Sequence, residues 1–167
     1  MHPFGEADAF GLVGESPAIW ELRQQIAFTA RQGPHVLILG SSGTGKELVA
    51  QAIHLLSRRG HRRLVSRNAA TFPEGVMDAE LFGNARNYPN AGMAERPGLI
   101  GEAHGSTLFL DEFGEMPTFL QAKLLRVMDL GEYQRLGESS TLRSDFRLLA
   151  ATNRAPEALK HDVLARL

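Results

Sequence analysis

The sequence predicts an α/β fold in which helices sandwich a parallel β-sheet, and three stretches carry this prediction. An apolar run at 36–39 breaks into a glycine-rich turn and continues into a segment with apolar residues at helical spacing. Two further apolar runs, at 107–110 and 146–151, each end in polar residues. Because ligands bind where parallel strands end, these runs are expected to bring their polar residues to one edge of the sheet.

The composition limits the possible classes of protein. With 167 residues, 43% of them hydrophobic, the chain is long enough for one domain with one core. Its net charge of -1 gives no overall basic field for nonspecific nucleic-acid binding. There is no cysteine for a disulfide and no run of about 18 apolar residues to span a membrane. Residues 1–6 do not resemble a secretory signal, so a cytoplasmic location is expected.

The first half of the chain is expected to contain two helices and two strands. Residues 1–14 read as an irregular lead-in, and residues 15–167 as the α/β domain. Ser16 is a suitable N-cap and Pro17 a suitable first residue for a helix that ends before Gly33. A strand at 35–39, the glycine-rich turn, a helix at 47–56 and a strand at 64–67 follow.

A basic turn at 57–63, which contains four arginines, lies between this helix and the second strand. Two interpretations are open. The arginines could contact nucleic acid or a neighbouring subunit's nucleotide. Alternatively, they form a solvated helix end and complement the helix dipole.

The second half is expected to add three helices, one long loop and two strands. The helices are predicted at 74–82, 97–103 and 118–129, with a stop at Gly131. The polar segment 83–92 is long for a connection within a domain, which suggests a functional loop. Strands at 106–110 and 146–151 flank a hairpin around Gly137, and a helix-like run at 156–167 follows.

The glycine-rich turn has the residue types of a phosphate-binding loop. It comprises Gly40, Ser41, Ser42, Gly43, Thr44, Gly45, Lys46 and Glu47. Glycines permit positive φ, so that successive N–H groups can point at a polyphosphate above a helix N-terminus, and Lys46 adds a positive charge. Glu47 stands where a hydroxyl residue usually ligates Mg²⁺. The alternative is a glycine-rich turn that only packs a helix onto a strand.

Polar side chains follow the two later strands at the same edge. Asp111 and Glu112 suit the Mg²⁺ and catalytic pair of a nucleotide hydrolase, with Asp111 holding the ion through its water shell and Glu112 polarising the attacking water. Because side chains alternate along a strand, only a local twist lets both carboxylates address one phosphate. Asn153 could orient water or touch the γ-phosphate. The alternatives are a polar turn for the acidic pair and a turn former for Asn153.

The segments 40–47, 105–112 and 150–154 together resemble the AAA+ domain of bacterial enhancer-binding proteins, the activators of sigma-54 RNA polymerase. That family carries glutamate directly after the P-loop lysine, as at Glu47, and the stretches 80–83, 114–117 and 120–127 also match it. The resemblance covers residues 12–167 and implies a P-loop NTPase fold, with ATP and Mg²⁺ as cofactors. It further implies an ATPase that works as a homo-oligomeric ring on sigma-54 RNA polymerase. Gly40–Glu47 would then hold the phosphates, and Val13 and Gly14 would lie near the adenine.

The resemblance also implies catalytic roles. Asp111 and Glu112 would form the Walker B pair, with Asp111 as the metal-binding residue. Asn153 would be the sensor I residue. Asn68 would be the asparagine that restrains the catalytic glutamate. Arg166 would be an arginine finger that reaches the γ-phosphate of a neighbouring subunit.

Three features depart from the family pattern. Asn87–Gly92 occupies the loop that usually ends in Gly-Ala-Phe-Thr-Gly-Ala and touches the sigma factor, and Lys160 stands where a second arginine finger is expected. The sequence ends at Leu167, before the family's last strand and helical lid, so weak or no activity is expected for this segment alone. DNA binding is expected only through a domain outside the sequence, and Val36–Leu39 should form an exposed sheet edge. A divergent regulator without sigma-54 contact and a nucleotide-dependent oligomerisation module without turnover therefore remain as alternatives.

Overall fold

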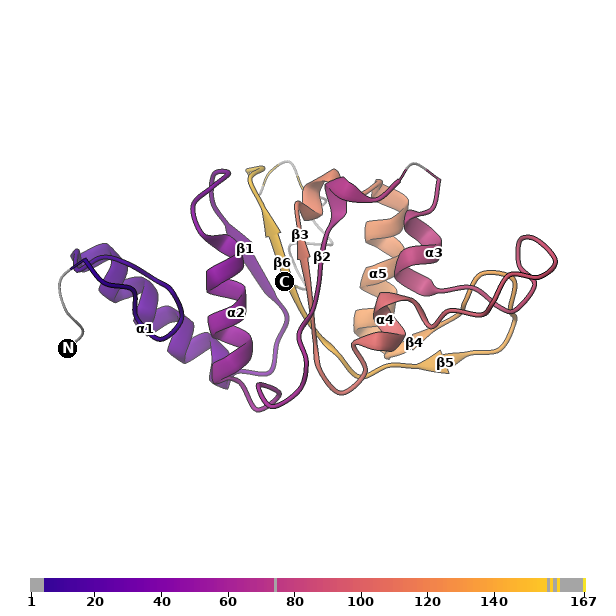
Figure 1. Ribbon diagram of the computed structural model, residues 1–167, viewed down its shortest axis with the longest axis horizontal. Helices are drawn as coiled ribbons and strands as arrows, with labels where there is room; N and C mark the ends of the chain where they lie inside the picture. The colour runs from indigo at the N-terminus through magenta and orange to yellow at the C-terminus, as the bar shows by residue number, and fades with distance from the viewer. Residues whose placement is uncertain (1–4, 74, 156, 158, 160–166) are drawn as a thin grey trace.

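A four-stranded parallel sheet forms the centre of the computed structural model, which describes residues 5–73, 75–155, 157, 159 and 167. Its strands lie in the order β1 (Val36–Leu39), β6 (Arg147–Thr152), β3 (Thr107–Asp111) and β2 (Val65–Asn68). Figure 1 shows that helices cover both faces of this sheet. The predicted α/β fold with a parallel sheet between helices is therefore confirmed.

The two faces of the sheet carry different helices. On one face lie α1 (Pro17–Arg31) and α2 (Lys46–Leu56), and on the other lie α3 (Met77–Phe82), α4 (Gly98–Glu102) and α5 (Thr118–Leu130) (Figure 1). Two short 3-10 turns, η1 (Ala69–Thr71) and η2 (Phe113–Glu115), follow β2 and β3. The antiparallel pair β4 (Glu132–Tyr133) and β5 (Leu142–Arg143) forms the predicted hairpin. None of the described helices has the length and apolar character to cross a membrane.

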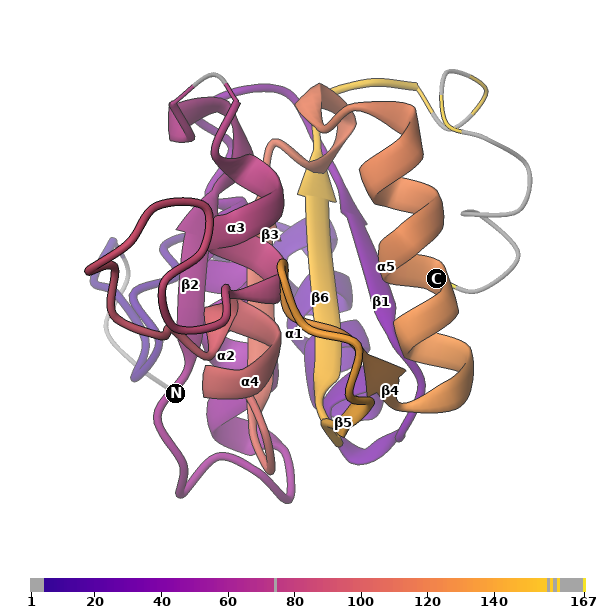
Figure 2. The same cartoon turned by 90° about the vertical axis from the view of Figure 1, so that its right-hand side faces the viewer.

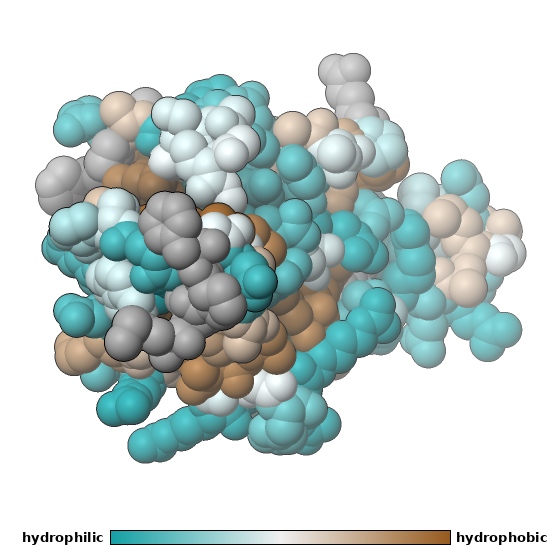
Figure 3. All heavy atoms as spheres, turned by 60° about the vertical axis from the view of Figure 1, so that its left-hand side comes forward, coloured by the Kyte–Doolittle hydropathy of each residue, from teal (hydrophilic) through white to brown (hydrophobic). Residues whose placement is uncertain are grey.

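The central strands are apolar on both sides because helices cover both faces. Alternate residues of β3 and β6 enter two separate cores. Leu108 and Leu148 pack in the core beneath α3, α4 and α5, whereas Phe109 and Leu149 pack beneath α1 and α2. The outer surface on the α1 side mixes apolar with hydrophilic side chains (Figure 3).

Buried polar contacts fix α2 on the sheet. His54, near the end of this helix, is 3% exposed. Its Nε2 lies 2.8 Å from the Arg62 carbonyl oxygen and its Nδ1 lies 2.9 Å from Thr107 Oγ1. Since the carbonyl can only accept, Nε2 donates to it and Nδ1 accepts the Thr107 hydroxyl. The helix that begins at Lys46 is thus held against β3 by its far end.

Most predicted boundaries are confirmed to within a few residues, and Ser16 caps α1 as predicted. The main difference is α3, which begins at Met77 instead of residue 74, because the chain first makes a turn in which Val76 N–H donates to the Pro73 carbonyl at 3.3 Å. Among the described strands β1 pairs only with β6, so Val36–Leu39 does form an edge. The helix expected at 156–167 lies almost wholly outside the described residues.

Candidate functional site

All four parallel strands of the central sheet bring their C-terminal ends to one edge, the upper edge in Figure 1. In the parallel register Leu39 pairs with Thr152, and Asn68 pairs with Asp111. The glycine-rich turn is tied to this edge where Gly40 N–H donates to the Thr152 carbonyl at 3.3 Å. The same edge can be followed around the molecule in Figure 2. The topology therefore brings the predicted turn, acidic pair and asparagine together.

The glycine-rich turn folds tightly at Gly40. The Thr44 hydroxyl donates to the Ser41 carbonyl at 2.7 Å and lies directly above Gly40. A Cβ on Gly40 would come within 2.7 Å of that hydroxyl oxygen and 3.6 Å of the Lys46 side chain, so any larger residue would displace the Thr44 hydroxyl. Gly43 and Gly45 adopt φ of +76° and +85°, which L side chains rarely adopt. The loop conformation is therefore one that the glycine spacing demands.

Lys46 closes the turn from inside. Only 7% of its surface is exposed, and its ammonium donates to the Gly40 carbonyl at 3.0 Å and the Ser41 carbonyl at 2.9 Å. Because an ammonium has three N–H donors, one more can reach an anion in the loop. Glu47 is exposed in the first turn of α2 and accepts from Gln51 Nε2 at 3.4 Å. There its negative charge complements the helix N-terminus.

The acidic pair contains the local twist that the strand geometry requires. Glu112 directly follows β3 and adopts φ 51° and ψ 40°, a left-handed conformation that is unfavourable for a residue with a side chain. Its N–H donates to Asp111 Oδ1 at 2.8 Å. Strained backbone of this kind is concentrated at functional sites. The conformation turns Glu112 away from the alternating pattern of the strand.

Asn153 contacts the glycine-rich turn directly. Its Nδ2 lies 3.4 Å from Ser42 Oγ, a long hydrogen bond between the end of β6 and the turn. Asn68, at the end of β2, accepts from Ala70 N–H through its side-chain oxygen at 2.9 Å, and it lies opposite Asp111 in the sheet register. The structure thus places Asn68 beside the acidic pair. Arg166 and Lys160 lie outside the described residues.

Two supporting contacts at this edge were not anticipated from the sequence. Arg154 forms an ion pair with Glu115 of η2 at 2.8 Å, and its N–H donates to Thr152 Oγ1 at 3.1 Å. The ion pair joins the turn after β3 to the end of β6, and the bond to Thr152 fixes Arg154 at that end. The partners are 39 residues apart in the sequence, so no local pattern could have indicated the pair.

The segment that carries Val13 and Gly14 is held by Arg23 of α1. The guanidinium of Arg23 donates to the carbonyls of Leu12 at 3.2 Å and Gly14 at 2.9 Å, and it forms an ion pair with Asp8 at 2.9 Å. Burial raises the pKa of the Asp8 carboxyl, but hydrogen bonds from Arg23 and from two backbone N–H groups outweigh it and lower the pKa overall. The part of the lead-in from Asp8 to Gly14 is therefore fixed to α1.

The geometry limits the chemistry of the site. A tight loop with an enclosed ammonium can bind phosphate groups, and two carboxylates with an amide nearby can hold a hydrated cation and orient water. Within the described segments no group of three or more histidine, cysteine, aspartate or glutamate side chains could hold a metal ion. An ion at Asp111 would therefore complete its shell with water or phosphate oxygens.

Comparison with known proteins identifies relatives of this arrangement. Residues 12–166 match the family model described as the sigma-54 interaction domain. The formate hydrogenlyase transcriptional activator FhlA of Escherichia coli K12 is 46% identical over 151 residues, which are 90% of this chain and 21% of FhlA. The anaerobic nitric oxide reductase transcription regulator NorR of Escherichia coli O1:K1 is 45% identical over 163 residues, which are 98% of this chain and 32% of NorR.

A solved structure is similar over nearly the whole chain. NtrX from Brucella abortus, crystallised in complex with ADP, superposes with a TM-score of 0.86 at 37% identity. The match covers 96% of this chain and 36% of the NtrX chain. The present chain thus spans between about a fifth and a third of the length of the curated relatives described above.

Proposed function

The chain belongs to the sigma-54 interaction domain family of P-loop NTPases, and on this premise we propose that it binds and hydrolyses ATP and, as a ring of identical subunits, uses that energy to remodel sigma-54 RNA polymerase. One observation carries the proposal. The loop around Lys46, the Asp111–Glu112 pair and Asn153 all meet at one edge of the sheet, and Glu112 is held there in a strained conformation.

The residues present fit ATP with Mg²⁺. The enclosed Lys46 ammonium and the turn at Gly40 favour phosphate groups, and Val13 and Gly14 form the backbone that would flank the adenine. Asp111 would hold Mg²⁺ through its water shell, with the carboxylate oriented by the bond from Glu112 N–H to its Oδ1. Bound Mg²⁺ supplies positive charge that offsets the charge on the phosphates. The complex of NtrX with ADP supports nucleotide binding by a homologous site.

The remaining roles follow from position. Glu112 would accept the proton of the attacking water. Asn68 lies opposite Asp111, the residue before Glu112, and would restrain the Glu112 carboxylate until the nucleotide is bound. Asn153 would orient the γ-phosphate or the water. Arg166 would act across a subunit boundary, which is why turnover is expected to depend on assembly.

Matched glutamate substitutions test this function. We expect Glu112→Gln to keep ATP binding in calorimetry and to lower steady-state phosphate release by at least about 100-fold, since a general base contributes about 10²–10⁴. Lys46→Ala should abolish binding itself. Glu102→Gln makes the same change at an exposed position on α4 and should leave both quantities unaltered. Wild-type turnover in Glu112→Gln would refute the assignment, and ATP-dependent assembly without any turnover in the parent would instead indicate an oligomerisation module.

The loop that follows α3 favours a second candidate function. It projects from the body beside the β4–β5 hairpin (Figures 1 and 2). Backbone bonds tie it to that hairpin, with Ala85 N–H donating to the Leu136 carbonyl at 2.8 Å. The Tyr88 ring lies so close to Gly137 that any side chain at residue 137 would collide with it. The loop is thus held to the hairpin, and it carries Asn87–Gly92 in place of the family's usual Gly-Ala-Phe-Thr-Gly-Ala, which favours a divergent regulator without sigma-54 contact.

Capture by sigma-54 distinguishes these two functions. We expect sigma-54 to retain the protein in the presence of ADP and aluminium fluoride, and Tyr88→Ala to weaken this retention. Phe119→Ala removes an exposed aromatic ring from α5 and is the matched control. Absence of retention while ATPase activity persists would favour the divergent regulator.

A further inference from the structure

A pocket lined by arginines opens at the opposite, N-terminal edge of the sheet. It has a volume of about 340 Å³ and lies among the ends of α1 and α2 and the start of β6. We call it the basic pocket; its lining residues are Ala30, Arg31, Gln32, Gly33, Ser57, Arg58, Arg59 and Arg147. None of them belongs to the nucleotide site, which lies at the far end of the same strands.

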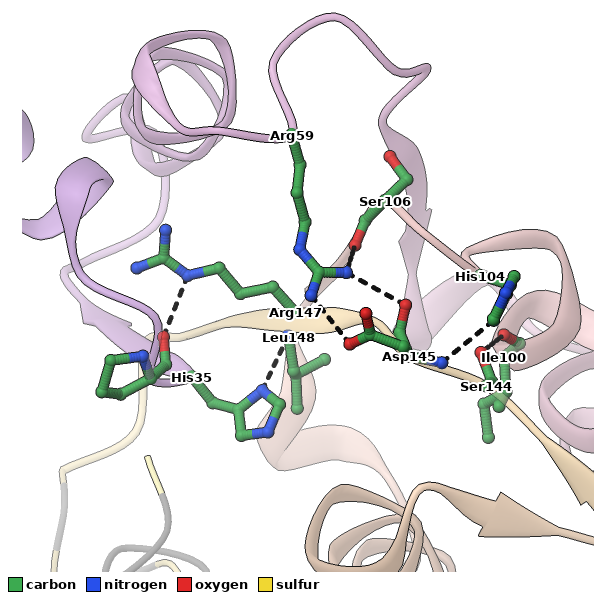
Figure 4. Close-up of polar contacts among 10 residues, drawn as sticks. His35, Arg59, Ile100, His104, Ser106, Ser144, Asp145, Arg147 and Leu148 are labelled. Atoms are coloured by element: carbon green, nitrogen blue, oxygen red, sulfur yellow. Dashed lines mark hydrogen bonds and ion pairs between the residues drawn. The ribbon is translucent and has the colours of Figure 1, made fainter.

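Arg147 forms a fixed floor for the basic pocket. The residue is 4% exposed. Its guanidinium donates to the carbonyls of Thr29 at 2.7 Å, Ala30 at 3.3 Å and Pro34 at 2.9 Å, and Figure 4 shows the last of these bonds. A guanidinium has five N–H donors, so these three contacts do not exhaust it. Arg147 also helps to end α1, because its guanidinium donates hydrogen bonds to carbonyls in the last turn of that helix.

Arg59 is fixed beside it from another segment. It donates to the Ser106 carbonyl at 3.1 Å and to the Asp145 carbonyl at 3.0 Å, and it forms an ion pair with Asp145 Oδ1 at 2.7 Å (Figure 4). The simple reading of the basic turn as a solvated helix end is therefore wrong for Arg59, which bonds across to the neighbouring strands. Two guanidinium groups are thus held near each other at the end of the sheet.

The rim of the pocket carries charge that the described structure does not balance. Arg31 and Arg58 are exposed, and no carboxylate of the described residues lies within ion-pair distance of either. The turn 57–63 contains no acidic residue. Burial and then the charge of Arg59 lower the pKa of Arg147, and burial and then the charges of Arg147 and Arg59 lower the pKa of His35. Burial is the larger cause of both shifts and the guanidinium charges add to it, whereas the charge of Asp129 acts in the opposite direction on His35.

We propose that the basic pocket binds a phosphate group, with Arg59 and Arg147 as a fixed floor and Arg31 and Arg58 as an exposed rim. Guanidinium groups suit this ligand because their paired N–H donors match the oxygens of a phosphate. The phosphate can come from a nucleic-acid backbone or from a free polyphosphate. With a nucleic acid, the arginines at 62 and 63 would extend the contact along the nucleic-acid strand. The site is independent of the glycine-rich turn and does not require hydrolysis.

Salt-dependent binding in a background without the P-loop lysine tests the proposal. Lys46→Ala removes the phosphate loop as a competing site, and a fluorescein-labelled DNA duplex of about 20 base pairs is titrated at several salt concentrations. We expect Arg31→Gln with Arg58→Gln to weaken binding and to reduce the slope of log K against log salt by about 2, since each phosphate contact contributes roughly 0.9. Arg86→Gln with Arg126→Gln removes the same charge from exposed positions elsewhere and should change the slope by less than half as much.

Each result decides the question. If inorganic tripolyphosphate binds the Lys46→Ala protein and the rim substitutions abolish this binding, the pocket is a phosphate site whether or not the duplex binds. Displacement of the duplex by tripolyphosphate at low concentration would identify the free anion as the better ligand. If neither probe binds, or if the rim and control pairs have equal effects, the proposal is wrong. Thermal denaturation confirms that each variant remains folded, because Arg31 and Arg58 are exposed.

Discussion

Replacing Glu112 by glycine should leave the protein more stable than replacing it by alanine, while both changes abolish its activity. Glu112 adopts φ 51° immediately after β3. A left-handed conformation costs a non-glycine residue roughly 1–2 kcal/mol, which Glu112→Gly would relieve. The greater entropy of glycine in the unfolded chain lowers the stability of this variant by about 0.5–1 kcal/mol. The expected net gain is about 0.5–1 kcal/mol relative to Glu112→Ala, which keeps the strain but removes the same side chain. Both variants retain the backbone bond from residue 112 to Asp111.

Thermal unfolding followed by circular dichroism measures this difference. For a domain of this size a gain of about 0.5–1 kcal/mol raises Tm by roughly 1–4 °C, so Glu112→Gly should melt above Glu112→Ala by that amount. Phosphate release should be lost in both variants. If Glu112→Gly melts at or below Glu112→Ala, the conformation at this residue is not strained and the inference from its φ angle fails.

Two further predictions concern the two ends of the sheet. Gly40→Ala should push the Thr44 hydroxyl aside and weaken ATP binding at least about 10-fold in calorimetry. Gly33→Ala, whose added Cβ would meet no atom within 4 Å, should leave ATP binding unchanged. Equal affinities of the two variants would contradict the tight turn. His35 Nδ1 accepts from Leu148 N–H at 2.9 Å, and its pKa is lowered from 6.5 by burial and by nearby arginine charges. Neutral His35 should therefore make its full contribution to the free energy of unfolding above about pH 6.5, and this free energy should fall as the pH drops below that value. Urea unfolding of His35→Asn should show a smaller fall in the free energy of unfolding between about pH 7.5 and 5.5.

The sequence predicted most of the fold because its strands and helices carry strong local signals. The strand at 107–111 contains three consecutive apolar residues at 108–110, and Ser16 with Pro17 marks the start of α1 in a way that local chemistry explains. The start of α3 was placed too early because proline at residue 73 suits a turn as well as a first helical turn. Only the tertiary structure selects between these two uses.

The candidate site was predictable where its residues are consecutive and unpredictable where they are not. The glycine spacing indicated a loop around Lys46, and strand ends indicated Asp111 and Asn153. The Glu115–Arg154 pair joins residues that are 39 positions apart in the chain, and the Arg23 contacts reach back from a helix to an irregular segment, so no helical or strand periodicity indicates either. The sequence indicated only that a local twist was needed at Glu112. It could not indicate the left-handed conformation itself, because the residue there is glutamate and not the glycine that usually marks such a conformation.

The edge position of β1 links nucleotide binding to strand pairing. Among the described strands β1 has one neighbour, β6, yet its last residue leads directly into the loop that encloses Lys46. We expect a chain that pairs with the open side of β1 to restrict this loop and thereby to change its affinity for phosphate. By thermodynamic reciprocity, a ligand in the loop changes the affinity of β1 for that chain by the same factor. Phosphate binding in the loop and strand pairing at the open side of β1 would therefore be thermodynamically coupled.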